Sequence, residues 1–470
     1  MSEQYRFPQD SFEWQSFVKK PWRLRWKLRS IPAHFGPEFQ EYYTLLGKSL
    51  YWSTEEIDKY QWRKASELVA HASKTVPFYQ RWFSDQKISG SDIRNWEDFK
   101  RLPIVSRTNI DQNLADFTST ELKLHRGSPA STSGSSGRVL KFYRSWYTES
   151  FRRAVLWRHF NQIGYHFKQP RVSLNVAFVD SEADLLYKYE PIDNLVMING
   201  RFLGAATAKA IHDLIKRFNP VMFYAHPVAL ATLGKSMEEV NLPPLNLPVT
   251  YVYSEVLSKA TRAIISRQIG PNVYDHFGNR ENSISASQFP CKHYHINSEF
   301  VYMELTPSPS VFEGQALNRV IGTNLINYAM PVLRYDCADL ATEIKPCGNC
   351  QINHPTIQFV GGRDKNFLVS RQGLLHCQFD DILHKHGIEM PDDIQVEQID
   401  IDTLVLRMVV GSDFVLERDE PILVGHLKDA TKGLFDIRVE YVDHIPQTQG
   451  FKKSKVVSRL GAEYLESQLK

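Results

Sequence analysis

Between residues 171 and 335, short apolar runs alternate with segments of helical periodicity, and this alternation constrains the fold most strongly. The apolar runs cover residues 172–179, 195–198, 221–224, 249–253 and 273–274, and the helical segments cover residues 205–218, 229–240 and 258–269. Short strands that alternate with helices are typical of a largely parallel sheet with helices on its faces. We therefore predict an α/β core in this part of the chain.

The segments on either side of this core have different patterns. Residues 1–130 are rich in Trp, Tyr and charged residues and show helical periodicity, for example over residues 54–71, which predicts a helix-rich leader. After Gly362, apolar runs at residues 394–399 and 404–410 predict a β-hairpin, followed by a charged helix at 421–433 and a strand at 435–442. We predict a large α/β N-terminal domain over residues 1–362 and a small, mobile α+β C-terminal domain over residues 363–470.

Composition excludes several classes of protein. The 470 residues are 42% hydrophobic and 23% charged, which is typical of a globular chain and not of a disordered or fibrous one. The net charge of +3 is too small to indicate a nucleic-acid partner. The sequence has no apolar signal segment at its start and no apolar run long enough to cross a bilayer, so we expect a cytoplasmic protein, either a monomer or a homodimer.

A basic and aromatic segment lies between Glu13 and Glu38. It contains six Lys or Arg residues, no acidic residue, and the tryptophans Trp14, Trp22 and Trp26. Such a segment can make peripheral contact with an anionic membrane surface. The alternative, which we favour, is a helix that packs its tryptophans on the core and leaves its charges in water.

Residues 131–137 form a stretch of Ser, Thr and Gly that precedes Arg138. In such a sequence backbone N–H groups can converge on an anion and hydroxyl groups add further donors, so the stretch can hold a phosphate group. The Gly-Lys-Ser/Thr of a Walker loop is absent, and a flexible Ser/Gly linker is the alternative interpretation.

Two further motifs place charged side chains directly after apolar runs. Residues 274–281 end in Arg280 and Glu281, a planar cation suited to phosphate and an acid suited to Mg²⁺. Residues 327–339 lead into Asp339 at the carboxyl end of a strand, where α/β sheets usually bind ligands. Taken alone, each motif is better explained as a surface turn with a local ion pair.

In their order along the chain, these motifs resemble those of the adenylate-forming (ANL) enzymes, and most of all the group of phenylacetate–CoA ligases and CapK-type proteins of capsular polysaccharide biosynthesis. The resemblance covers residues 103–460, and residues 324–331 before Arg334-Tyr335 are its most specific part. It implies the fold of an acyl-adenylate synthetase. In this family a carboxylic acid attacks the α-phosphate of ATP, which gives an acyl-adenylate and pyrophosphate, and the acyl group then passes to a thiol or an amine.

The resemblance implies a nucleotide site made of the residues that match the family's motifs. The cofactor-binding residues would be Thr132, Ser133, Gly134, Ser135, Ser136, Gly137 and Arg138 of the phosphate loop, together with Glu255, His276, Phe277, Gly278, Asp339, Arg363 and Lys365. Phe277 would stack on adenine, Asp339 would bind the ribose hydroxyls, and Arg363 would contact the ribose at the domain junction. Glu281 would bind Mg²⁺, and Arg280 would meet the α-phosphate where most members have Thr.

The catalytic lysine of the family lies on a C-terminal loop, before a strand of the form Val-Val/Ile-Ser. Counting back from Val456-Val457-Ser458 assigns this role to Lys452, with Lys453 as the alternative. A compact ammonium group on a flexible stem can enter the site with its domain and bridge carboxylate and phosphate oxygens. A solvated basic loop is the other interpretation of these residues.

Five cysteines are too few for a disulfide framework in this length, and two of them form the motif Cys347-Gly348-Asn349-Cys350. This spacing points both sulfurs at one ion. The donors Cys291 and His295 lie upstream, with His293 as the alternative nitrogen. The resemblance implies that Cys291, His295, Cys347 and Cys350 hold a structural Zn²⁺. Reduced cysteines without a metal and a redox pair are the alternatives.

The resemblance leaves the two substrates open. The acid can be an aryl acid, an amino acid or a sugar-linked carboxylate, and the acceptor can be CoA or an amine on a glycan precursor. A degenerate ANL-fold protein that binds or scaffolds without adenylation is the alternative function, because the chain departs from the family's pattern at Ser135-Ser136, Arg280, Ala338 and Phe451.

Overall fold

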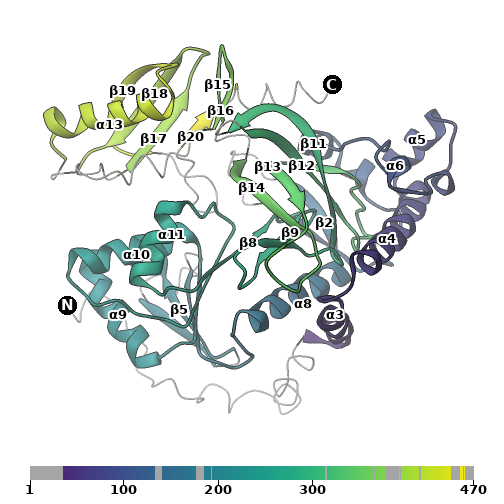
Figure 1. Cartoon of the computed structure of the whole chain (residues 1–470), viewed down its shortest axis with the longest axis horizontal. Helices are drawn as coiled ribbons and strands as arrows, with labels where there is room; N and C mark the ends of the chain where they lie inside the picture. The colour runs from purple at the N-terminus through teal and green to yellow at the C-terminus, as the bar shows by residue number, and fades with distance from the viewer. Residues whose placement is uncertain are drawn as a thin grey trace.

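The computed structural model describes residues 35–132, 140–175, 185–191, 193–312, 315–363, 367–376, 391, 393–411, 414–445, 456–458 and 460. These residues form a large α/β body, with helices at both ends of a long sheet, and a smaller unit near the C-terminus (Figure 1). Within them, the large sheet joins twelve strands in the order β11-β12-β13-β14-β10-β9-β8-β7-β6-β3-β5-β4.

One half of this sheet is built from parallel strands and their crossover helices. The strands are β3 (Arg171–Asn175), β5 (Leu195–Asn199), β6 (Met222–Ala225), β7 (Val249–Tyr253) and β8 (Val273–Gly278), with β4 (Tyr187–Glu190) antiparallel at the edge. The helices are α9 (Ala205–Phe218), α10 (Pro227–Glu239) and α11 (Lys259–Gln268). The five apolar runs and the three helical segments of the sequence therefore correspond to real elements, and α9 has the predicted bounds.

The packing of α9 explains why helical periodicity is clear in this part of the sequence. Ile211, Leu214, Ile215 and Phe218 recur at helical spacing and are buried in one core with strand residues such as Phe223. Each such side chain contributes about 1.5–3 kcal/mol when it is fully buried. The helix ends at Asn219, which adopts a left-handed conformation with a φ of 51° and donates its N–H to the carbonyl of Ile215.

The other half of the large sheet is antiparallel, which corrects the prediction of a largely parallel sheet up to residue 335. Its strands are β9 (Ser285–Gln288), β10 (Tyr294–Ile296), β11 (Val301–Phe312), β12 (Gln315–Asn324), β13 (Tyr335–Lys345) and β14 (Thr356–Arg363). The reason lies in the connections. Residues 279–284 and 289–293 are too few to form the crossover that parallel neighbours need, so β8, β9 and β10 pair as antiparallel neighbours.

Helices from the first third of the chain cover the antiparallel half of the sheet (Figure 1). They are α3 (Pro37–Ser49), α4 (Thr54–Thr75), α5 (Pro77–Asp85), α6 (Trp96–Phe99), α7 (Arg107–Gln112) and α8 (Trp146–Gln162), with 3-10 turns at Gly90–Asp92, Leu114–Phe117 and Gly200–Phe202 elsewhere in the chain. Ser53 and Glu56 form a capping box at the start of α4, which continues four residues past the predicted segment 54–71. A two-stranded hairpin, β1 (Gly127–Ser131) and β2 (Lys141–Ser145), precedes α8.

The small C-terminal unit has its own sheet, in the order β19-β18-β17-β20, with β17 (Asp393–Gln398), β18 (Thr403–Val409), β19 (Asp436–Tyr441) and β20 (Val456–Ser458). The predicted hairpin is β17–β18, and the predicted last strand is β19. A separate pair, β15 (Phe367–Ser370) and β16 (Gly373–His376), precedes it. Strand β14 ends at Arg363, and the domain boundary between residues 362 and 363 remains a prediction.

Helix α13 (Leu416–Ala430) begins five residues before the predicted start at Pro421. The carboxylate of Asp419 accepts a hydrogen bond of 2.8 Å from the backbone N–H of Val415, the residue that precedes the helix. This bond satisfies an N–H at the helix start that would otherwise lack a partner. Pro421 therefore lies inside the helix, and Leu423 and Leu427 pack into the core of the small unit.

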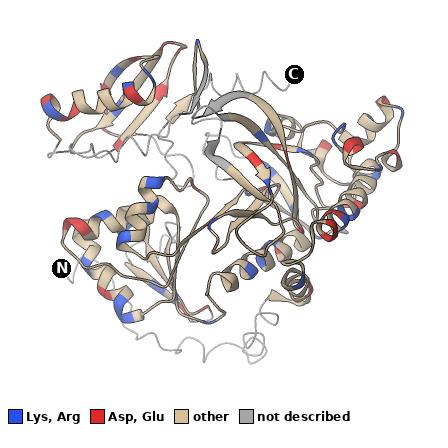
Figure 2. Cartoon of the chain, viewed as in Figure 1, with Lys and Arg blue, Asp and Glu red and all other residues tan. Residues whose placement is uncertain are grey.

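None of the helices in the described part of the chain has the length and apolarity that a bilayer crossing requires. Figure 2 shows acidic and basic residues mixed along outer helices such as α9, α10 and α13. The basic segment between Glu13 and Glu38 lies almost entirely outside the described residues, which begin at Phe35.

Candidate nucleotide and acid site

Three parallel strands end at one edge of the sheet and place several predicted residues there. The register pairs Ala225 of β6 with Val252 of β7, and Tyr253 of β7 with His276 of β8. The residues that follow these strands therefore leave the sheet at the same edge, as is usual for ligand sites in α/β sheets. Glu255, Phe277 and Gly278 belong to this edge.

Glu255 holds the loop after β6 in place. One carboxylate oxygen lies 3.6 Å from Nδ1 of His226, and the other accepts a hydrogen bond of 3.4 Å from the backbone N–H of Val228 in the first turn of α10. A negative charge at a helix N-terminus is favourable because the first N–H groups have no partner in the helix. The structure thus gives Glu255 a role in positioning the helix that borders the site.

Glu281 faces a pocket at the end of the segment that follows β8. The pocket is lined by Leu140, Phe142, Glu281, Asn324, Met330 and Tyr335, among others. One carboxylate oxygen accepts a hydrogen bond of 3.3 Å from the Tyr335 hydroxyl. The other is buried and has no hydrogen-bond partner within the described residues, so it is available to a ligand. A carboxylate oxygen is a suitable donor for Mg²⁺, and Glu281 therefore fits the ion that the resemblance implies.

The segment 324–331, the most family-specific part of the sequence, joins the walls of this pocket. Asn324 donates a hydrogen bond of 2.8 Å to the carbonyl of Asn282, next to Glu281. Asn327 accepts from the backbone N–H of Ser145 at 3.1 Å and donates to the carbonyl of Tyr143 at 2.9 Å. The two amide side chains therefore fix strand β2 and the Glu281 segment relative to each other.

The Ser/Thr/Gly stretch is closed at its base. The N–H of Thr132 donates to the carbonyl of Leu140 at 3.0 Å, and the N–H of Leu140 donates to the Thr132 hydroxyl oxygen at 3.1 Å. Thr132 is buried. Its hydroxyl oxygen therefore holds the two ends of the loop together, and strand β2, which follows Leu140, leads to Phe142 in the wall of the pocket that contains Glu281.

Asp339 lies in β13 after an unusual backbone turn. Ala338 has a φ of 61°, a conformation that favours glycine, and its N–H donates to the Asp336 carboxylate at 2.9 Å. The backbone of Asp339 is opposite Arg363 of β14, and the register shifts by a bulge after this pair. Two predicted ribose-binding residues are thus neighbours across the sheet, and the side chain of Arg363 lies outside what the structure describes.

Aromatic and charged side chains surround this edge, and among them the sequence did not single out Arg152. Tyr224 stacks on Tyr253 with ring centroids 4.3 Å apart and on Tyr251 at 5.4 Å. Arg152 of α8 donates a hydrogen bond of 2.6 Å to Glu149. Burial, followed by the nearby Arg152 cation, lowers the pKa of His276 to about 4, so this histidine is neutral at pH 7. The only sequence signal for Arg152 was its spacing from Glu149 on a helix, which also fits a surface ion pair.

The remaining predicted residues fall into two groups. Arg280 is exposed beside Glu281, and Phe277 is partly buried against the large core. Residues 133–139, which contain Ser133, Gly134, Ser135, Ser136, Gly137 and Arg138, lie outside the described residues, as do Lys365, Lys452 and Lys453. Their roles stay predictions.

The four predicted zinc ligands lie together. One donor atom from each of Cys291, His295, Cys347 and Cys350 lies within 4.8 Å of the others. Nε2 of His295 is 3.4 Å from the sulfurs of both Cys291 and Cys350, and its Nδ1 is 2.9 Å from the carbonyl oxygen of His354. A proton on Nδ1 leaves the Nε2 lone pair facing the sulfurs, which is the form that binds metal. The donor set fits Zn²⁺, and it has no open position.

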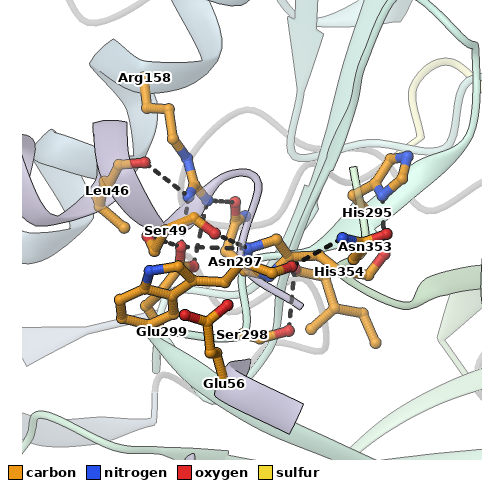
Figure 3. Close-up of polar contacts among 12 residues, drawn as sticks. Leu46, Ser49, Glu56, Arg158, His295, Asn297, Ser298, Glu299, Asn353 and His354 are labelled. Carbon is orange, nitrogen blue, oxygen red and sulfur yellow. Dashed lines mark hydrogen bonds and ion pairs between the residues drawn. The ribbon is translucent and has the colours of Figure 1, made fainter. Parts of the chain in front are cut away.

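A buried ion pair is linked to His295 of this cluster through His354 (Figure 3). Arg158 of α8 donates to Glu299 at 2.6 Å and to Asn297 at 2.8 Å, and both charged side chains are at most 4% exposed. Ser49 also donates to Glu299, and Nε2 of His354 lies 2.9 Å from the carbonyl oxygen of Ser49. The network thus connects α3, α8 and the strand region that holds the cysteine cluster.

No family model matches the chain. Among curated proteins, Protein CapK of Staphylococcus aureus is 22% identical over 424 residues, which cover 86% of this chain and 90% of CapK. A phenylacetate-coenzyme A ligase of Aromatoleum evansii is 22% identical over 385 residues, which cover 77% of this chain and 83% of that protein.

Among solved structures, 2-hydroxyisobutyryl-CoA ligase in the postadenylation state, in complex with 2-HIB-AMP, has a TM-score of 0.65 and 16% identity. The match covers 90% of this chain and 94% of the ligase. The same ligase in its thioesterification state gives a TM-score of 0.53. This likeness confirms the predicted fold class. The curated relatives, together with the order of the motifs, support the resemblance to the adenylate-forming (ANL) superfamily, in the group of CapK and the phenylacetate–CoA ligases.

Proposed function

We propose that this chain is an AMP-forming acid ligase. It activates a carboxylic acid with ATP as an acyl-adenylate, releases pyrophosphate, and transfers the acyl group to the thiol of CoA. The observation that carries the proposal is the buried oxygen of Glu281, which faces a pocket whose walls come from the motifs at 274–281 and 324–335 and from the strand that follows the 131–137 loop. The relatives named phenylacetate-coenzyme A ligase support both the reaction and the acceptor.

The chemistry of the first step explains this choice of residues. The acid carboxylate and the triphosphate repel each other, so the site must neutralise phosphate oxygens and align the carboxylate with phosphorus. Glu281 would hold Mg²⁺, which neutralises phosphate charge, and Arg280 lies next to it on the exposed side. The loop 132–138 would supply N–H groups to the outer phosphates, Phe277 would stack on adenine, and Asp339 would accept hydrogen bonds from both ribose hydroxyls.

The acid would bind beside the stacked tyrosines Tyr224, Tyr251 and Tyr253, at the carboxyl ends of β6 and β7. The Tyr251 hydroxyl is buried and has no hydrogen-bond partner among the described side chains and backbone groups. Lys452 would enter the site when the C-terminal domain closes, and it would leave when that domain rotates for acyl transfer. The rotation would occur near Arg363–Asn366, and the reaction would take place in the cytoplasm.

The test is an acid-dependent pyrophosphate assay with the full chain, ATP and Mg²⁺, over aryl acids, amino acids and sugar-linked acids. We expect release with at least one acid, and mass spectrometry should show the acyl-CoA product only when CoA is present. Glu281→Gln should reduce the release by about 10²–10³-fold, the scale for losing one preorganised electrostatic contact. Glu239→Gln makes the same change at an exposed position at the end of α10 and should have no effect.

Two outcomes would redirect the proposal. Pyrophosphate release followed by a product that forms with an amine and without CoA would identify an acid–amine ligase. No release with any acid, from protein that is folded and carries its metal, would favour the degenerate binding protein.

A further inference from the structure

A second cluster of metal-binding side chains lies away from the cysteines, between α4 and the segment that leads into β1. It consists of His71, Glu121 and His125, and the donor atoms of the three side chains all lie within 4.8 Å of one another. Nδ1 of His71 is 3.7 Å, and Nε2 of His125 is 3.4 Å, from the same carboxylate oxygen of Glu121. The two imidazole rings are perpendicular, with centroids 4.9 Å apart.

The surroundings of His71 fix its protonation in the form that binds metal. Its Nε2 is 2.9 Å from the carbonyl oxygen of Tyr328 and 3.1 Å from the Thr75 hydroxyl. A carbonyl oxygen can only accept, so Nε2 carries the proton and the lone pair lies on Nδ1, the atom that faces Glu121.

His125 provides the second, independent observation. Its Nε2 is buried and has no hydrogen-bond partner in the described part of the chain, although Glu121 lies close to it. A buried polar atom without a partner is costly, and native proteins rarely keep one without a ligand or water. The rings of His71, His125 and Tyr328 pack together, so both histidines are held in these positions.

We propose that His71, Glu121 and His125 bind a divalent transition-metal ion such as Zn²⁺, at a site separate from the cysteine cluster. Bonds of about 2.0–2.2 Å to a tetrahedral ion place ligand atoms about 3.4 Å apart, which matches the separations of 3.4 and 3.7 Å. Two imidazoles and one carboxylate form an N/O donor set that suits Zn²⁺ and its neighbours in the series. Three protein ligands leave one position open, and the Glu121 side chain is 45% exposed, so solvent can reach the ion.

The proposed metal site lies next to the 324–331 segment, which lines the pocket that contains Glu281. The N–H of Ser119 donates to the carbonyl of Ala329 at 3.1 Å, and His71 contacts the carbonyl of Tyr328, so the cluster touches the 324–331 segment. Strand β1 begins at Gly127, two residues after His125, and runs into the loop that starts after Ser131. A bound ion would therefore fix the start of the β1–β2 hairpin against α4.

The decisive measurement is metal binding, so it does not depend on the proposed reaction. Full-length protein stripped of metal is titrated with Zn²⁺ by calorimetry and with Co²⁺ by absorption spectroscopy. We compare the wild type with Glu121→Gln/His125→Gln, and with the control Glu97→Gln/His166→Gln, which makes the same two changes at exposed positions outside the cluster. The wild type and the control should bind one more equivalent of metal than the cluster variant. That extra Co²⁺ should show no thiolate charge-transfer band, because its ligands are nitrogen and oxygen.

A second variant tests whether misfolding of the double variant explains a loss of metal binding. Glu121→Gln alone changes a partly exposed side chain and should weaken the same equivalent by at least tenfold while circular dichroism stays unchanged. The proposal is overturned if the cluster variant binds as many equivalents as the wild type with the same affinity. It is also overturned if Cys347→Ser/Cys350→Ser removes all metal binding from a folded protein.

Discussion

Replacing Arg158 with Met should destabilise the large domain severely, because it leaves Glu299 charged and without its main partner. Burial alone would raise the pKa of Glu299, but Arg158, then His354 and the hydrogen bonds from Ser49 and Arg158, lower it from 4.5 to about 2. This difference corresponds to about 3 kcal/mol in favour of the charged form in the folded state. Removal of one partner of a buried pair typically costs about 3–5 kcal/mol, and we expect a loss in that range at pH 7.

Urea unfolding followed by tryptophan fluorescence is the suitable assay. The nine tryptophans all lie between Trp14 and Trp157, so the signal reports on the large domain and not on the C-terminal unit. Arg158→Met/Glu299→Leu is the matched control, because it replaces both charges with apolar groups of similar size. It should recover most of the loss, since a buried pair and its apolar replacement are often similar in stability.

The pH dependence gives an independent check. Because the folded-state pKa of Glu299 is lowered, its contribution to stability is complete above about pH 4.5 and is lost as the pH falls from there toward 2. The advantage of the wild type over Arg158→Met should shrink as the pH falls, beginning where Glu299 of the variant takes up its proton and ending near pH 2, since protonated Glu299 needs no cation. A loss below about 1 kcal/mol at pH 7, or a double variant no more stable than the single one, would refute this account of the pair.

Three further predictions test the proposed site. Asp339→Ala should weaken ATP binding by at least about tenfold in calorimetry, because charge-assisted bonds to the ribose contribute about 1.5–3 kcal/mol each; unchanged affinity would remove Asp339 from the ribose site. Lys452→Ala should slow adenylate formation by about 10²–10³-fold and leave transfer from a supplied acyl-adenylate nearly unchanged, whereas Lys453→Ala should do little in either assay. If Lys453 carries the effect, the loop is aligned one residue wrongly. Cys347→Ser/Cys350→Ser should release Zn²⁺ and lower the unfolding temperature, as elemental analysis and thermal scans would show, and wild-type protein purified without chelator but free of zinc would contradict the site.

Periodic patterns in the sequence are sufficient to predict the helices and strands that bury one face against neighbouring elements. Helix α9 and the β17–β18 hairpin have the predicted type and nearly the predicted bounds, because burial alone sets their periodicity. Periodicity does not predict whether neighbouring strands are parallel or antiparallel, because this depends on the length of the connections between them. The strands from β9 onward in the large sheet are antiparallel. The start of α13 was missed because a single side chain, Asp419, sets it.

The residues of the candidate site also differ in how far the sequence alone can predict them. Residues grouped in short motifs, such as Cys347 with Cys350, could be predicted from their spacing. Arg158 and Glu299 are 141 positions apart, and nothing in the local sequence links them. Likewise, Glu121 and His125 form an i, i+4 pair in the turns before β1, but their partner His71 comes from helix α4. Contacts of this kind arise only when distant elements pack.

The closed base of the loop after β1 has a consequence for how this site can evolve. Thr132 and Leu140 hold the two ends of the loop together. The entropic cost of closing the loop therefore depends little on which residues lie between them. Residues between these two ends can then be exchanged at little cost to folding. The change from the family's Thr-Thr-Gly-Lys-Pro to Ser135-Ser136-Gly137-Arg138-Val139 is a substitution of this kind. If the loop binds the phosphates as we propose, grafting a relative's five residues between these fixed ends should alter nucleotide affinity without altering the fold.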